Sequence, residues 1–206
     1  MIRSSHIALL VFLAILLGIS ATAEPISDAI AAYGKQDYAT AFRLARPLAD
    51  KGNADVQFLL GMMYRDGEGV PPDEAVGASW LLRAAEQGHR RAQFFVGSSY
   101  NRGKGVPEDP VEGAKWLLRS AEQGFAAAQL DLGAAYTTGR GVPRDNVQAY
   151  LWSHLATTQF APGDHRIEIA TFSRDNAASS MTAEQIAEAQ RLAREWKPKP
   201  EKQGKK

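Results

Sequence analysis

The chain has 206 residues, enough for one domain with a substantial core, and 45% of them are hydrophobic, as in ordinary soluble proteins. Its formal net charge is +1, and Arg3 is the one charged residue among residues 1–23. The remaining 23 basic and 23 acidic side chains balance, so the charge composition does not resemble that of a basic nucleic-acid-binding protein, and we expect no nucleic-acid partner. The chain has no cysteine, which excludes disulfides, thiol nucleophiles and thiolate metal sites.

The first 23 residues have the three parts of a secretory signal peptide. A short basic start precedes an apolar run of 13 residues from Ile7 to Ile19, and Ala21-Thr22-Ala23 matches the A-x-A cleavage pattern. We expect cleavage between Ala23 and Glu24. The alternative is a retained anchor, but the run is shorter than the roughly 20 residues of a membrane-spanning helix. The predicted location is periplasmic or secreted, with no stable membrane span after cleavage.

In chain order, the mature sequence begins with a short predicted helix at 26–33, in which Ser27 is a candidate N-cap, followed by helices at 38–51 and 54–66. Helices that begin after three aspartates then alternate with helices near 90–102 and 126–138. Aspartate suits such starts because its side chain accepts hydrogen bonds from the free N–H groups of the first turn. Glu112 and Gln148 have the residue type and spacing of capping boxes. The three aspartates are Asp73, Asp109 and Asp145.

An internal repeat organises these helices. A phrase with glycine, tyrosine, Gly-x-Gly and Val-Pro begins at Gly61, Gly97 and Gly133, so each copy starts 36 residues after the one before. A period of about 20–50 residues is typical of stacked-repeat proteins. With no strand-like runs, the pattern predicts an all-α, right-handed α/α solenoid of three to four two-helix repeats. Other residues that keep the step are Trp80, Trp116 and Trp152, and Gln57, Gln93 and Gln129.

The repeated glycines have structural interpretations. Gly61, Gly97 and Gly133 fall within predicted helices, where glycine costs about 1 kcal/mol relative to alanine, so we expect a neighbouring helix to cross there, too close for a Cβ atom. The Gly-x-Gly pairs resemble a phosphate-binding loop, but they follow helices and lack the Gly-Lys-Ser/Thr ending. We therefore expect them to end helices and turn the chain. The pairs are Gly67 and Gly69, Gly103 and Gly105, and Gly139 and Gly141.

The domain boundaries follow from where the repeat starts and lapses. We predict an N-terminal capping helix at 24–36, repeats at 37–160 and two C-terminal capping helices at 161–196. Phe160 stands where Gly88 and Gly124 stood in earlier units, which marks the lapse. Thr182 to Gln185 has the sequence of a capping box and opens the last helix. The lysine-rich residues 197–206 are predicted to be a disordered basic tail.

Two segments carry a family resemblance. Residues 80–93 read WLLRAAEQGHRRAQ and residues 116–129 read WLLRSAEQGFAAAQ, and both resemble the Sel1-like repeat, a relative of the tetratricopeptide repeat. The resemblance implies an α/α solenoid with adaptor or regulatory roles in bacterial envelopes. The first unit departs from the pattern, with Phe42 and Leu44 where later units carry Ala78 and Trp80, as is common for terminal repeats.

We find no catalytic, cofactor-binding or metal-binding pattern in the sequence. The motifs of serine hydrolases, zinc proteases and S-x-x-K enzymes are missing. His154 and His165 flank the lapsed repeat, but two histidines without a third ligand make a weak zinc pattern. Glu86 and Glu122 occupy equivalent positions in successive units, which favours a solvated face over a catalytic carboxylate pair.

The leading functional hypothesis is a binding groove on the stack. Trp80, Trp116 and Trp152 form either an aromatic ladder along that groove or, as their register favours, packing between repeats. Arg83 and Arg119, one turn further on, are candidate charged groove contacts. We predict an exported, monomeric, non-catalytic scaffold that binds an unidentified protein partner. The alternatives are an envelope protein that contacts peptidoglycan or another polysaccharide, and a hydrolase like the cysteine-rich relatives linked to β-lactam hydrolysis.

Overall fold

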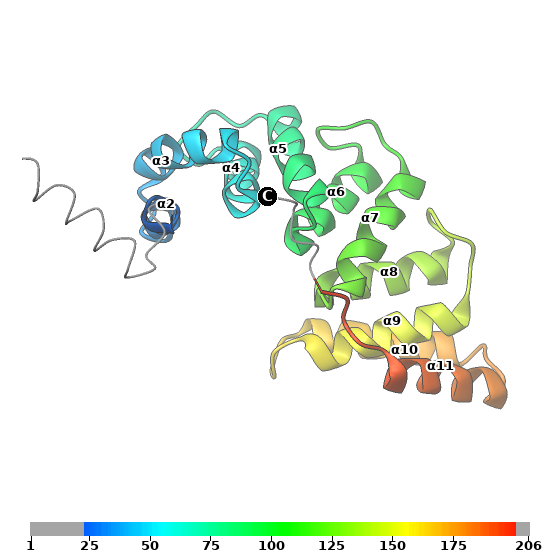
Figure 1. Ribbon diagram of the computed structural model, residues 1–206. Helices are drawn as coiled ribbons and strands as arrows, with labels where there is room; N and C mark the ends of the chain where they lie inside the picture. Colours follow the sequence, from blue (N-terminus) through cyan, green and yellow to red (C-terminus); the bar gives the residue numbers. More distant parts are fainter. Residues whose placement is uncertain (1–22, 201–206) are drawn as a thin grey trace, which may run out of the picture.

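Ten α-helices and no strand make up residues 23–200, the part of the chain that the computed structural model describes. Figure 1 shows these helices stacked in a curved row. The predicted all-α solenoid is therefore confirmed. In chain order the helices are α2 (Ala23–Gly34), α3 (Tyr38–Asp50), α4 (Ala54–Asp66), α5 (Glu74–Glu86), α6 (Arg90–Arg102), α7 (Pro110–Glu122), α8 (Ala126–Thr138), α9 (Asn146–Gln159), α10 (Arg166–Ala178) and α11 (Ala183–Glu195).

Close crossings at glycine hold the helices in pairs. A Cβ atom added to Gly97 of α6 would lie 2.9 Å from the carbonyl oxygen of Gly113 and 3.1 Å from the amide nitrogen of Leu117, both in α7. Gly61 of α4 meets Gly77 and Leu81 of α5 in the same way. The predicted crossings therefore exist. α9 carries Ala149 at the position where α5 and α7 carry Gly77 and Gly113. Gly133 of α8 therefore faces Ala149 and Ser153.

Three aspartates cap the first helices of these units. Asp109 accepts hydrogen bonds from the amides of Val111 and Glu112, both at 3.0 Å. Asp73 caps α5 through two amides in the same way, and Asp145 caps α9 through one. Each aspartate thereby satisfies amides that have no partner within the helix.

Only one of the expected capping boxes forms. Thr182 and Gln185 exchange both hydrogen bonds at the start of α11, as predicted. The prediction was wrong at Glu112 and Gln148, because each side chain has a competing partner one turn further along its helix. Glu112 binds the Lys115 ammonium group at 2.9 Å, and the Gln148 amide oxygen accepts from Trp152 Nε1 at 3.1 Å.

The Gly-x-Gly loops join the helices of each pair. Gly67, Gly103 and Gly139 end α4, α6 and α8 in the left-handed conformation, where glycine carries no steric penalty. The second glycine lies against the first turn of the helix that precedes the pair: Gly105 touches the backbone of Glu74 so closely that no Cβ atom fits. The loops are therefore structural, and their backbone is in contact with protein.

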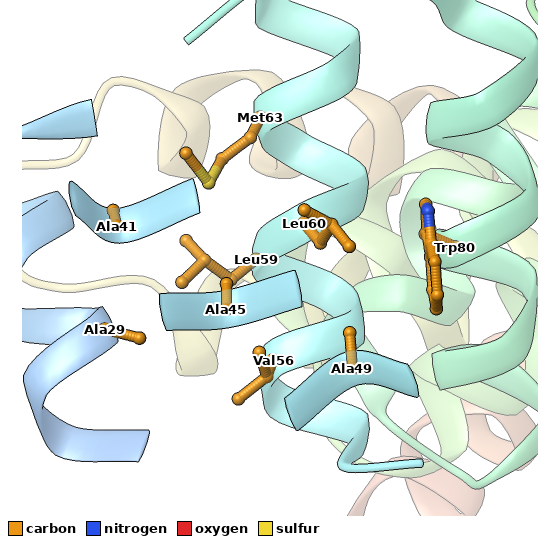
Figure 2. Packing of buried hydrophobic residues seen from close by; sticks show 9 residues of the cluster. All are labelled: Ala29, Ala41, Ala45, Ala49, Val56, Leu59, Leu60, Met63 and Trp80. Atoms are coloured by element: carbon orange, nitrogen blue, oxygen red, sulfur yellow. The ribbon is translucent and has the colours of Figure 1, made fainter. Parts of the chain in front are cut away.

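The core consists of clusters that each join neighbouring repeats. Figure 2 shows one of them, in which Leu59 and Met63 of α4 point toward the alanines of α3. Leu60 lies on the other side of α4 and points toward Trp80 of α5. α4, the second helix of its repeat, is thus packed on both sides, against α3 of its own repeat and α5 of the next. Packing of this kind links successive repeats.

The N-terminal end of the described structure differs from expectation in one detail. α2 begins at Ala23, so Ser27 lies inside the helix and is not its N-cap. Residues 1–22 of the predicted signal peptide lie outside the described residues, and cleavage between Ala23 and Glu24 stays a prediction. Within residues 23–200, none of the helices is both long enough and apolar enough to cross a bilayer.

The C-terminal end corrects the prediction of a disordered tail. α10 and α11 both pack on α9. Residues 197–200 then lie against the turn between α7 and α8, and the Lys199 amide donates to the carbonyl oxygen of Glu122 at 2.7 Å. The lysine-rich composition of these four residues wrongly indicated disorder, because it does not show that folding places the end of α7 beside them. In Figure 1 this red segment runs along the inner side of the curved stack. Residues 201–206 lie outside the described residues.

Candidate functional site

The three repeated tryptophans are buried between repeats and do not line a groove. Only 6% of Trp80, 5% of Trp116 and 5% of Trp152 is exposed to solvent. Each ring packs into the core of the preceding unit; Trp116, for example, lies with Leu81 and Val96 of α5 and α6. The prediction of groove contacts was therefore wrong for the tryptophans, and packing in register accounts for their recurrence.

The two repeated arginines are exposed and cover these rings. The guanidinium carbon of Arg83 lies 4.5 Å from the ring centroid of Trp80, and that of Arg119 lies 4.3 Å from Trp116. Such cation–π contacts contribute about 0.5–1 kcal/mol at exposed sites. Of the predicted groove contacts, Arg119 alone lines a hollow described below. The fourth unit carries Leu155 at this position, so the arginine row ends with α7.

A groove of about 400 Å³ lies between the C-terminal ends of α5 and α7. Glu86 and Arg119 contribute charged side chains to its wall, from two successive units. Lys199 and Pro200 of the C-terminal segment complete it. The Lys199 ammonium nitrogen lies 2.6 Å from a carboxylate oxygen of Glu122, whose side chain is 30% exposed. The groove therefore already holds a piece of polypeptide.

Histidines in the described chain have local structural partners. His89 caps α6, because its Nδ1 accepts a hydrogen bond from the Ala92 amide at 3.1 Å, and its ring stacks on Phe58. His154 stacks on Tyr150, whereas His165 is largely exposed beside Asp164. Within residues 23–200, no three histidine, aspartate or glutamate side chains converge as metal ligands.

The partly buried imidazole of His154 should make the folded protein less stable in acid. Burial, and then the nearby Arg174 guanidinium, lower the pKa of this imidazole. The unfolded chain therefore binds the proton more readily, and the free energy of unfolding should fall as the pH drops below about 6.5. Urea denaturation at neutral pH and at about pH 5 measures this loss. His154→Gln should reduce it and the exposed-site control His165→Gln should not; equal losses in all three proteins would contradict the role of His154.

A scan against protein-family models matches the Sel1 repeat at residues 31–53, 54–89, 90–125 and 126–159. Together these matches cover more than half of the chain. The chain belongs to the Sel1 repeat family. Members of this family are generally scaffolds for protein interaction and are generally non-catalytic. The predicted family is thereby confirmed.

Two solved Sel1 repeat structures resemble this one. A protective antigen of uropathogenic Escherichia coli, with an SLR fold, is 32% identical with a TM-score of 0.66; the match covers 76% of this chain but only 32% of the antigen. A Sel1 repeat protein from Oxalobacter formigenes is 27% identical with a TM-score of 0.65, and the match covers 82% of this chain and 74% of that one. Comparison with curated proteins finds no match.

Buried glutamines connect the Sel1 repeats in a way that the sequence reasoning missed. Gln93 donates to the Ala85 carbonyl oxygen of the preceding repeat at 3.1 Å, and its own amide oxygen accepts from Gln123 at 2.8 Å. Gln57 makes the equivalent bonds with Ala49 and Gln87. The recurrence of glutamine at 87 and 123 was the signal that could have revealed these pairs.

The glutamine chain stops in the fourth Sel1 repeat. Gln129 is fully buried, and within the described chain its amide oxygen has no hydrogen-bond partner. Gln159, which stands 36 residues after Gln123, is exposed at the end of α9. The pairing of glutamines in the two preceding repeats therefore does not continue into the fourth.

Proposed function

We propose that this protein is an exported, monomeric, non-catalytic scaffold that binds another protein of the bacterial cell envelope along the inner side of its curved stack. The observation that supports this most strongly is the groove between α5 and α7, because two successive Sel1 repeats form it and a segment of polypeptide lies in it. Rigid repeats that present such grooves are a common means of binding extended partners. The signal-peptide pattern of residues 1–23 supports export.

Site-specific crosslinking in intact cells tests this proposal. A photoreactive amino acid placed at Arg119 should give a covalent adduct with a partner protein, because this side chain lies in the groove. The matched control is the same amino acid at Glu168, which is exposed on α10 and outside the groove. Mass spectrometry of the adduct identifies the partner.

The location is tested in the same experiment. We expect the adduct in the envelope fraction, with the scaffold beginning at Glu24. Adducts that form equally from both positions, or none from Arg119, would contradict binding in the groove. A chain that keeps residues 1–23 and stays in the cytoplasm would contradict export.

A further inference from the structure

The first turns of α5 border a second hollow, which lies apart from the groove of the C-terminal segment. Its volume is about 280 Å³, close to the lower end of the range for small-molecule sites, about 300–1,000 Å³. Glu74 of α5 lines this hollow, whereas Glu86 lines the groove at the opposite end of the same helix. We call the hollow the α6 pocket, because α6 contributes four of its lining residues: Phe95, Ser98, Ser99 and Arg102.

The two serines of the α6 pocket depart from the pattern of the repeat. Serine stands at 98 and 99, whereas the equivalent positions carry methionine at 62–63 in α4 and alanine at 134–135 in α8. The stack of helices therefore forms without hydroxyl groups at these two positions in the neighbouring units. Packing between repeats does not account for Ser98 and Ser99, which leaves room for a role in binding.

The polar side chains that α6 presents to the pocket have unused donors. Within residues 23–200, the hydroxyls of Ser98 and Ser99 make no hydrogen bond, and the side chain of Arg102 makes neither a hydrogen bond nor an ion pair. The charge of Arg102 acts on Asp131 of α8 only from beyond ion-pair distance. Both serines are partly buried, so their hydroxyls have limited access to water. A ligand in the pocket can accept hydrogen bonds from all three side chains.

The other charges in the wall are paired with one another. Arg65 binds the Asp66 carboxylate through two N–H groups, at 2.7 and 2.8 Å. The Lys104 ammonium nitrogen lies 3.7 Å from a carboxylate oxygen of Glu74. These two pairs cancel, so Arg102 leaves the pocket with one net positive charge. That charge favours a monoanion over a phosphate dianion, which the two carboxylates of the same wall would repel.

We propose that the α6 pocket binds the carboxylate of a small organic acid. The guanidinium group of Arg102 has parallel N–H donors whose spacing matches the two oxygens of a carboxylate. The hydroxyls of Ser98 and Ser99 donate to the same group. The rest of the acid lies against the apolar part of the wall, to which Leu81 and Phe95 contribute.

Titration of the purified, 15N-labelled protein with 3-phenylpropionate, followed by nuclear magnetic resonance, tests this proposal. This acid carries one carboxylate on an apolar body, and 3-phenylpropanamide is its uncharged counterpart. We expect saturable shifts in the backbone signals of Ser98, Ser99 and Arg102, with a dissociation constant on the order of 1 mM. The uncharged counterpart should bind at least about tenfold more weakly, because it forms no charge-assisted hydrogen bond with Arg102.

Variants of the pocket separate specific binding from general attraction of an anion. Arg102→Gln should weaken binding of 3-phenylpropionate at least about tenfold, since it removes the charged donor. The matched control Arg43→Gln, at an exposed position of α3, should change binding by no more than about twofold, because a distant surface charge is screened. Ser98→Ala with Ser99→Ala should weaken binding about threefold or more. This double change should keep the fold, because α8 carries alanine at both equivalent positions.

Four results would overturn the proposal. They are the absence of saturable shifts at the α6 pocket, equal binding of the acid and its uncharged counterpart, equal losses from Arg102→Gln and Arg43→Gln, and tighter binding of inorganic phosphate than of the acid. The pocket and the partner groove lie at opposite ends of α5. Crosslinking of a partner at Arg119 would therefore be unaffected by such a failure, and this proposal and the proposed function fail separately.

Discussion

Replacing Gly97 by leucine is expected to unfold the chain or to lower its free energy of unfolding by about 3 kcal/mol or more. The added side chain would start 2.9 Å from the carbonyl oxygen of Gly113, which belongs to the backbone of α7 and cannot rotate away. Relief therefore requires α6 and α7 to separate, and this would also open the core around Leu117 and Val96. Urea denaturation followed by far-ultraviolet circular dichroism measures the loss.

A matched control separates the crossing from the effect of a larger residue in a helix. Ala134 of α8 is exposed and stands one residue after Gly133, the equivalent of Gly97. Ala134→Leu should change the free energy of unfolding by no more than about 0.5 kcal/mol. If Gly97→Leu were equally mild, the two helices would not meet at this glycine in solution.

The fold was predictable because each repeated residue meets a backbone requirement that recurs in every repeat. Gly97 recurs where no Cβ atom fits, and Asp109 recurs where helix amides need an acceptor. Each of these two requirements can be met by only a few residue types, so the residue type at that position indicates the local structure. A period of 36 residues then placed the helices of the repeats without any knowledge of long-range contacts, whereas α10 and α11 lie beyond the last repeat.

The candidate site was less predictable because a period does not say which way a side chain points. Trp116 and Arg119 recur with the same step, yet the ring is buried and the guanidinium group is exposed over it. Lys199 posed a different difficulty. Its sequence neighbours are typical of a solvated tail, and its partner Glu122 is 77 residues away. Only the folded stack brings the end of α7 and the C-terminal segment together.

The burial of the tryptophans leads to the second large effect. Trp116→Ala should lower the free energy of unfolding by about 3–5 kcal/mol, because it removes a 5% exposed ring from the junction of two Sel1 repeats and leaves a cavity. It also removes the surface on which Arg119 lies, which adds about 0.5–1 kcal/mol. The midpoint of urea denaturation measures the effect.

The control for Trp116→Ala is Phe172→Ala, which truncates an aromatic ring that is 74% exposed on α10. We expect a change within about 0.5 kcal/mol, since little apolar area leaves the core. The comparison also separates the two interpretations of the tryptophan row. A groove-lining ring could be removed with little loss of stability and a large loss of partner binding, whereas a ring between repeats loosens the junction and impairs binding only as the stack unfolds. A Trp116→Ala protein as stable as the parent would therefore refute the packing role.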